Sequence, residues 1–522
     1  MNKNINIMQL EAKDVAEGIE TKSFTRYKAS FDYSLESIKM AEIYKKVYRN
    51  NRFTFVNNDK FYSDAVISIS FKYNLFNKKE DGTLEVLEDT NTLREKLYRD
   101  GFVCNGNRYV RYKRSSGSSR VGKCLFILEG LYSPMMKWSY NGLYYRPDEN
   151  LDLASVEAYL SLPMSSIIST LQILPENILL IDDYESIFTD KVMATRVNDK
   201  HRLYTQEEEL EISNSIWDGQ SLMDTSLFGH KFRNKGMLLL RNRFFKSCCF
   251  HTNIQQFFED NNITEISQLN GSTIATDIHD IKIITTPSSI KYLKYSSFEK
   301  WIENLDPTFG IVKFDKPPHF FNGDMVQTHY QLLNTLELSY GETEEFLQDS
   351  LNYVRLLKTD LSVLRFQLKM NIERDLDIND ISTTNEFVYT MLNINDKIQN
   401  TNMFYEFRKE LINSYIEQLR RGRVLIDGNY STLMGNGYEM LLASIGKFDG
   451  ESILHGDEVI SYRFEPDEEI LAVRSPHITM GNLWVTKNVR KGLYEQYFNL
   501  SRQIICINTI DNNVLQRLNG SD

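Results

Sequence analysis

The chain has 522 residues, enough for roughly three or four domains, and its 41% hydrophobic and 25% charged residues are typical of a folded globular protein and exclude wholesale disorder. Its formal net charge of −11 argues against a protein that coats nucleic acid non-specifically, although local basic grooves are compatible with it. Because the five cysteines form no C-x-x-C pair and no window approaches a membrane span, we expect reduced thiols, a cytoplasmic location and no membrane contact.

Residues 1–200 are predicted to form a mixed α+β region. Alternating apolar residues predict strands at 52–56 and 65–73, and a helical pattern covers 92–99. Farther along, the helix-like stretches are 155–162 and 167–174, and an apolar strand covers 178–181. This strand ends at Asp182 and Asp183, a pair that is more typical of a turn or a helix cap than of a metal site.

A basic hairpin is predicted within this region at residues 107–124. Its tip, from Gly117 to Lys123, has the spacing G-x-x-x-x-G-K of a phosphate-binding loop. The context argues against such a loop, because a basic strand precedes it, an apolar strand follows, and Cys124 replaces the required hydroxyl. Two interpretations stay open: a tip that contacts nucleic-acid phosphates, and a solvated basic hairpin. The candidate contact residues are Arg114, Arg120 and Lys123.

Residues 201–300 contain turn signals that bound short strands, as in a barrel. These signals are Trp-Asp-Gly at 217–219 and Asn-Lys-Gly at 234–236. The acidic run 206–211 is predicted to begin a solvated helix, and 281–284 is a further apolar strand. Lysines at strand ends beside glycines can point together at phosphates, although lysines that flank turns are common on any surface.

Residues 301–420 are predicted to be a mainly helical connector. Apolar residues recur three and four positions apart between 347 and 368, and the pattern continues at 387–398 and 404–419. A packed core is more plausible here than a dimerising coil, because the heptad is not sustained. The connector ends in basic side chains that either grip a nucleic-acid strand or form a solvated helix end. These are Arg420, Arg421 and Arg423.

Residues 421–522 are β-rich. An apolar run at 470–473 enters an Arg-Ser-Pro-His turn, a second run follows at 503–507, and the sequence ends in Asn-Gly-Ser-Asp. A strand that leads into a glycine-tight turn projecting an aspartate is typical of a metal-holding carboxylate. We therefore expect Asp522 to be a metal ligand and the chain to be interrupted inside its active site.

Taken together, these motifs resemble the two-barrel RNA polymerase superfamily, most closely the cellular RNA-dependent RNA polymerases of RNA silencing and their bacterial and phage relatives. The resemblance covers about residues 210–522. The similar segments are 217–222 (the Asp-Gly-x-Gly segment), 234–237 (Lys-Gly-Val/Met), 240–246 (Leu-Arg-Pro-Ser-x-x-Lys-Phe), 473–477 (Arg-Asn/Ser-Pro) and 520–522 (the Gly-Ser-Asp that opens the metal loop).

The resemblance implies an α+β fold on a double-psi β-barrel polymerase core, with a complete first barrel, a helical insert and a partial second barrel. It implies that Lys235 and Lys246 contact the reacting phosphates, with Lys231 as a third candidate. It also implies that Asp522 is the first of three aspartates, of which the other two are absent. Further candidate nucleic-acid contacts are Arg241, Arg243 and Arg474.

We therefore expect part of a template-directed RNA polymerase that joins nucleoside triphosphates with Mg²⁺ by two-metal chemistry once a missing C-terminal part is supplied. Its partners would be a nucleic-acid template, the RNA product, nucleoside triphosphates and a downstream chain that carries the rest of the metal loop. The isolated chain is expected to be inactive. The alternative is a catalytically inactive nucleic-acid-binding or scaffolding protein derived from such a polymerase. Departures from the family pattern at 241–243 and 478–483 indicate a divergent branch, nearer the bacterial or phage relatives.

Overall fold

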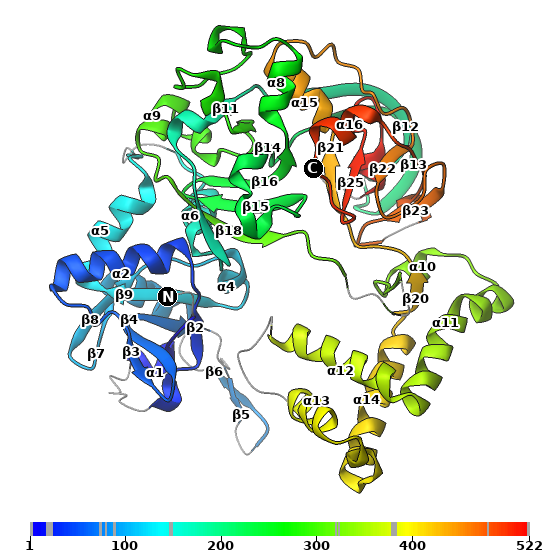
Figure 1. The fold of residues 1–522 in the computed structure, drawn as a ribbon. Helices are drawn as coiled ribbons and strands as arrows, with labels where there is room; N and C mark the ends of the chain where they lie inside the picture. Colours follow the sequence, from blue (N-terminus) through cyan, green and yellow to red (C-terminus); the bar gives the residue numbers. More distant parts are fainter. Residues whose placement is uncertain are drawn as a thin grey trace.

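The computed structural model describes residues 4–16, 24–71, 76–78, 81–86, 90–145, 150–318, 321, 324–376, 384–477 and 480–518. These residues form a mixed α+β structure with an N-terminal sheet unit, two further sheets that share a core, and a helical unit (Figure 1). All five cysteines are free thiols. Within the described ranges, no helix has both the length and the apolar character needed to cross a membrane.

The N-terminal unit is a seven-stranded sheet with helices packed on it. The predicted strand at 65–73 is confirmed for residues 65–70, and residues 72–73 lie outside the described ones. The helix predicted at 92–99 is confirmed, whereas the strand predicted at 52–56 begins three residues later, at Phe55. In order across the sheet the strands are β2 (Ala29–Phe31), β1 (Ile5–Glu11), β4 (Lys60–Ser70), β9 (Lys123–Leu128), β8 (Asn107–Arg111) and β7 (Phe102–Cys104), and β3 (Phe55–Asn57) also pairs with β4. The helices are α1 (Ala12–Ala16), α2 (Leu35–Tyr48), α3 (Thr90–Asp100), α4 (Ser116–Arg120) and α5 (Glu129–Tyr140), and a separate hairpin joins β5 (Phe76–Lys78) to β6 (Leu84–Val86).

The second sheet in the chain, called here the first barrel sheet, also has seven strands. In order they are β10 (Ser169–Gln172), β18 (Thr308–Phe314), β15 (Met237–Asn242), β16 (Phe245–Thr252), β14 (Gln220–Asp224), β17 (Ile283–Thr285) and β11 (Ile178–Leu180). Its helices are α6 (Leu153–Leu160), α7 (Gly229–Phe232), α8 (Ile254–Asp260) and α9 (Phe298–Glu303). The sheet therefore extends on both sides of the predicted barrel range 201–300.

The helix predicted at 167–174 is wrong, because residues 169–172 form β10 and pair antiparallel with β18. A short apolar run does not by itself distinguish a strand from a helix, and the β-branched residues Ile167, Ile168 and Thr170 favour the strand. The predicted strands at 178–181 and 281–284 correspond to β11 and β17, and the predicted helix at 155–162 corresponds to α6.

The third sheet, called here the second barrel sheet, has five strands. In order they are β21 (Thr432–Gly435), β25 (Ile504–Ile507), β22 (Glu458–Ser461), β24 (Leu483–Asn488) and β23 (Glu469–Val473). The helices of this part are α15 (Gly437–Ser444), α16 (Gly492–Tyr497) and α17 (Val514–Arg517). The run predicted at 470–473 lies in β23, and the run predicted at 503–507 contains β25.

The two barrel sheets contain the same five-stranded unit. From β15 through β16, β14 and β17 to β11, neighbours are antiparallel, parallel, antiparallel and parallel, and the same sequence of directions runs from β23 through β24, β22 and β25 to β21. The chain order of the strands matches too. The first unit runs β11, β14, β15, β16 and β17 along the chain, and the second runs β21, β22, β23, β24 and β25. In each unit a helix, α8 or α16, lies between the fourth and fifth strands. The chain therefore contains a structural repeat.

The strand registers of the two units also correspond. Leu222 pairs with Ile284 in the first unit, and Ile460 pairs with Cys506 in the second. All four side chains are buried in one core that both sheets share. Because neighbouring residues of a strand point to opposite faces, Met223 instead enters a separate core, against which α5 of the N-terminal unit also packs.

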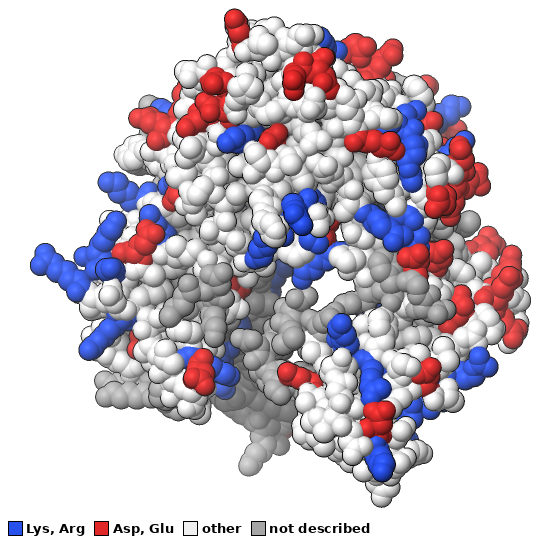
Figure 2. Space-filling view, viewed as in Figure 1, with Lys and Arg blue, Asp and Glu red and all other residues white. Residues whose placement is uncertain are grey.

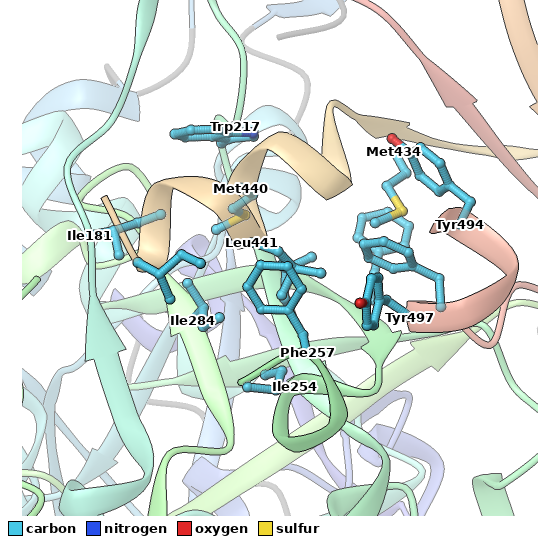
Figure 3. Packing of buried hydrophobic residues seen from close by; sticks show 14 of the residues in the cluster. Ile181, Trp217, Ile254, Phe257, Ile284, Met434, Met440, Leu441, Tyr494 and Tyr497 are labelled. Carbon is cyan, nitrogen blue, oxygen red and sulfur yellow. The ribbon is translucent and has the colours of Figure 1, made fainter. Parts of the chain in front are cut away.

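The shared core holds the two barrel sheets together. In Figure 3, Trp217 and Ile284 from the first unit and Met434 and Tyr497 from the second unit gather around Met440 and Leu441 of α15. Burying each such side chain contributes roughly 1.5–3 kcal/mol. The predicted second barrel thus has counterparts of five of the seven strands of the first, whereas β10 and β18 have none among its described strands.

A long two-stranded arm joins β11 to β14, formed by β12 (Glu185–Val197) and β13 (Leu203–Ser215). The helix start predicted for the acidic run 206–211 is therefore wrong, because these residues lie in β13. The base of the arm is bound to the second unit, where Ser186 Oγ donates to Asp511 Oδ1 at 2.9 Å and Asn214 Nδ2 donates to the Thr509 carbonyl at 2.8 Å.

The helical unit confirms the helical pattern predicted for the connector but not its continuity. The stripe between 347 and 368 is broken at Asp360, which ends one helix and accepts from the Ser362 amide at 2.8 Å at the start of the next. The main helices are α11 (Tyr340–Thr359), α12 (Leu361–Leu376), α13 (Thr384–Ile394) and α14 (Asn402–Arg420), with α10 (Leu332–Thr335) before them, and the unit is bounded by the pair β19 (Met325–Gln327) and β20 (Leu425–Asp427).

Candidate nucleic-acid interface

A basic cluster lies at the turn end of the β15–β16 hairpin. Arg241 and Lys246 are cross-strand partners, as are Met237 and Phe250 farther along the same hairpin. By strand alternation, all four side chains are on the face that carries the shared core. On that face, Arg241 is buried, with 9% of it exposed, and its guanidinium donates to the Leu240 carbonyl at 2.8 Å, whereas Lys246 is exposed.

A third cation joins this cluster from the segment that follows β17. The Lys246 amide donates to the Ser289 carbonyl at 3.1 Å, and the Lys291 amide donates to the Phe244 carbonyl at 2.7 Å. Partial burial lowers the pKa of Lys246, and the positive charges of Arg241 and Lys291 lower it further. Cations held together in this way are stabilised when an anion such as a phosphate binds among them. We call Arg241, Lys246 and Lys291 the basic cluster.

Lys235 lies at the other end of β15. Its ammonium nitrogen is 4.8 Å from the centre of the Phe314 ring, and that of Lys316 is 5.8 Å from the centre of the same ring, so both lysines lie over one aromatic side chain. Gly236 and four residues of β15 separate Lys235 from Arg241 of the basic cluster, a span of up to roughly 20 Å of extended chain.

Gly236 brings the Lys235 end of β15 against the second unit. A Cβ atom at this position would lie 2.8 Å from the Ser501 backbone nitrogen, so only glycine permits so close an approach. The Lys235 carbonyl accepts a hydrogen bond from His251 Nδ1 at 2.8 Å, which fixes the backbone beside the lysine. Lys231, the third candidate of the sequence, is exposed on α7 with its ammonium nitrogen 5.2 Å from the Phe232 ring centre.

Polar contacts missed by sequence reasoning fix the joint between the repeated units. Gln220 makes a paired contact with Gly435, donating to its carbonyl at 2.8 Å and accepting from its amide at 3.0 Å. Trp217 Nε1 donates to the Asn436 carbonyl at 3.0 Å. Asn436 itself has a positive φ of 43°, a conformation that asparagine tolerates better than most residues. In the sequence, the Gly-Asn-Gly pattern at 435–437 is the feature that indicates this turn.

Arg243, a predicted nucleic-acid contact, is bound inside the protein. Its side chain is 8% exposed, and its guanidinium donates to the Trp138 carbonyl at 2.8 Å and the Asn304 carbonyl at 2.7 Å. This burial lowers the pKa of Arg243 to about 10. Arg243 therefore ties the β15–β16 turn to α5. The sequence placed Arg243 beside Arg241 in one basic motif, but the hairpin turn separates their environments.

Basic side chains of the segment 107–124 form contacts with other parts of the protein. Arg114 forms an ion pair with Glu157 at 2.7 Å, and Lys123 Nζ donates to Gln9 Oε1 at 2.8 Å. Lys123 begins the strand β9, at the position where a phosphate-binding loop would require the start of a helix. Only Arg120 of the three predicted contacts is exposed, at the end of α4. The segment thus favours the structural interpretation over the nucleic-acid one.

The remaining predicted arginines are exposed and lie away from the β15–β16 hairpin in sequence. Arg420 pairs with Glu417 at 2.6 Å at the end of α14, and Arg421 and Arg423 follow it. Arg474 Nη1 donates to the Leu518 carbonyl at 3.0 Å. In Figure 2, Lys and Arg side chains gather around a hollow at the centre of the visible face, below the barrel sheets and beside the helical unit.

Asp522, the predicted metal ligand, lies outside the described residues. Within the described ranges, no three histidine, cysteine, aspartate or glutamate side chains converge on one point. Asp183 accepts from the Ser288 amide at 2.9 Å and so caps a turn, as the preferred interpretation of the Asp182–Asp183 pair required.

His251 gives a test of this geometry through pH. The imidazole stacks on Phe228 with ring centres 3.7 Å apart, and burial lowers the pKa of His251. The unfolded chain therefore takes up this proton at higher pH than the folded one, so stability is full above the ordinary pKa and falls as the pH drops below about 6.5. His251→Gln should lose less melting temperature between pH 7.5 and 5.5 than the unaltered protein. The exposed His455→Gln is the control, and equal losses in all three proteins would contradict the assignment.

No protein-family model matches the chain, and no curated protein matches it by sequence. Among solved structures it is similar to the RNA-dependent RNA polymerase QDE-1 from Thielavia terrestris, with a TM-score of 0.49 and 12% sequence identity. The match covers all of this chain and 53% of that polymerase, so the chain spans about half the length of that protein.

Proposed function

We propose that this chain is the nucleic-acid-binding core of a template-directed RNA polymerase. One observation carries the proposal: a repeated five-stranded unit presents basic side chains where its two copies meet. The sequence motifs support it independently, since the resemblance implies two barrels separated by a helical region. The structure has that order, with the helical unit between the first and second barrel sheets.

The spacing of the basic groups favours a nucleic-acid strand over a free nucleotide. Lys235 precedes β15 and Arg241 of the basic cluster lies near the far end of that strand, up to roughly 20 Å away along extended chain, a distance that one triphosphate does not span and several consecutive phosphates do. Lysine ammonium groups suit this task because they act as compact charges without a fixed angle of approach. In this proposal the basic cluster and Lys235 hold phosphates of the template–product strands and of the incoming triphosphate.

The proposed cofactor is Mg²⁺, as the resemblance implies, and the proposed ligands are Asp522 with aspartates of a further polypeptide. The proposed chemistry is the joining of nucleoside triphosphates into RNA. The alternative, a catalytically inactive binding or scaffolding protein, shares the same nucleic-acid contacts. The two therefore differ in synthesis and not in binding.

RNA synthesis on a primed template separates the two hypotheses. The chain alone should bind single-stranded RNA but incorporate no nucleotides. Combined with the polypeptide encoded directly downstream, if this carries the Asp-x-Asp motif, it should extend the primer with Mg²⁺, and Asp522→Ala should abolish extension. Binding without extension by the combined protein would establish the alternative.

A further inference from the structure

One edge of the second barrel sheet is open among the described strands, whereas the equivalent edge of the first barrel sheet is covered by a strand. In the first barrel sheet, β18 pairs antiparallel with β15, joining Leu239 to Lys313, Leu240 to Ile311 and Arg241 to Gly310. In the second, β23 corresponds to β15, and among the described strands it pairs only with β24. The repeat therefore shows what kind of segment this edge accepts.

The backbone of β23 is oriented to accept a strand. The Asn488 amide donates to the Glu468 carbonyl at 2.9 Å, which places this pair in the bonded register of the antiparallel ladder. Since bonded and non-bonded pairs alternate, the backbone groups of Glu469, Leu471 and Val473 point away from β24, toward the free edge. An open row of backbone donors and acceptors is a template for another strand.

The side chains of β23 do not protect this edge. The strand has no proline and no lysine, the residues with which proteins commonly block a free edge. Leu471 is 45% exposed and its cross-strand partner Val485 is 58% exposed. These positions correspond to Arg241 and Lys246, so the repeat replaces the basic pair of the first unit by an apolar pair in the second.

The charges at this edge define the occupant further. Aligning the two units through their registers places Glu469 at the position of Leu239, which faces Lys313 of β18. A docked strand therefore has a place for a cation opposite the exposed Glu469. Ile470 corresponds to Leu240, so the residue opposite it is apolar, as Ile311 is in the first barrel sheet.

We propose that β23 binds an extended segment of a partner polypeptide, which adds antiparallel to the edge with an apolar residue opposite Ile470 and a lysine or arginine opposite Glu469. The main-chain hydrogen bonds supply the attraction and the alternate side chains supply the selectivity. This inference rests on the structural repeat and is independent of polymerase activity.

A labelled peptide that copies residues 306–316, which contain β18, is the probe. Added to the full chain, it should raise fluorescence anisotropy in a saturable way. Leu471→Pro removes the backbone donor that points to the free edge and leaves the ladder to β24 intact, so the peptide should bind at least tenfold more weakly to it than to Leu471→Ala. Val103→Pro, on the edge strand β7 of the N-terminal sheet, is the control and should bind the peptide normally.

A charge exchange tests the register without disturbing the fold. Glu469→Lys should weaken binding of the peptide, and a peptide with glutamate at the position of Lys313 should recover it. The proposal is overturned if the β18 peptide does not bind, or if it binds equally to Leu471→Pro. It is also overturned if the chain forms dimers that Leu471→Pro dissociates, because the occupant would then be a second copy.

Discussion

Trp217→Ala is expected to lower the free energy of unfolding by about 3–5 kcal/mol, the usual cost of removing a large buried aromatic side chain. Trp217 is 2% exposed in the shared core, and its indole N–H donates to the Asn436 carbonyl at 3.0 Å across the two units. The substitution therefore leaves a cavity and an unpaired carbonyl at the joint. The midpoint of urea unfolding, followed by circular dichroism, measures the effect.

Two further variants separate packing from hydrogen bonding at this position. Trp217→Phe keeps an aromatic ring and loses the donor, so it should cost less than the alanine substitution by about 2 kcal/mol or more. Tyr144→Ala removes an aromatic ring that is 82% exposed and should change stability by less than about 0.5 kcal/mol. Equal effects of Trp217→Ala and Tyr144→Ala would show that the two barrel sheets do not share a core.

The double substitution of Lys235 and Lys246 by alanine is expected to weaken binding of single-stranded RNA about tenfold at moderate salt, because each lysine neutralises one phosphate. The slope of the logarithm of the association constant against that of salt concentration should become shallower by about 1.4. Fluorescence anisotropy of a labelled oligonucleotide over a salt series measures both quantities.

The matched control for this pair is the double substitution of Lys45 and Lys46 by alanine, which removes the same charge from the exposed end of α2. Binding to this variant should equal that of the unaltered chain. If both doubles weaken binding alike, the net charge of the protein governs the interaction. The basic groups of the β15–β16 hairpin would then have no special role.

The elements that the sequence predicted well are those determined by residues close together in the chain. The strand β4, the helix α3 and the helical pattern around Leu357 and Leu368 follow from periodicity and propensity over a short window. The acidic stretch in β13 was predicted to begin a solvated helix from its run of charged residues. Its strand conformation depends on pairing with β12, and the short stretch of sequence around residues 206–211 contains no information about that pairing.

The candidate site was only partly predictable for a similar reason. Turn and glycine signals placed Lys235 and Lys246 at strand ends, but burial of Arg243 depends on carbonyl groups of Trp138 and Asn304, which are distant in sequence. The repeat leaves almost no trace in the sequence. Its equivalent residues, such as Phe245 and Trp484, share an apolar character and buried position but not identity.

Photo-crosslinking of RNA tests the central claim most directly. A single-stranded RNA that contains 4-thiouridine is irradiated with the full chain, and the linked peptides are identified by mass spectrometry. The account predicts links in segments 231–246, 289–294 and 313–316, which carry Lys235, the basic cluster and Lys316. Links confined to the tip of the basic segment at Arg120, or to the end of α14, would contradict it.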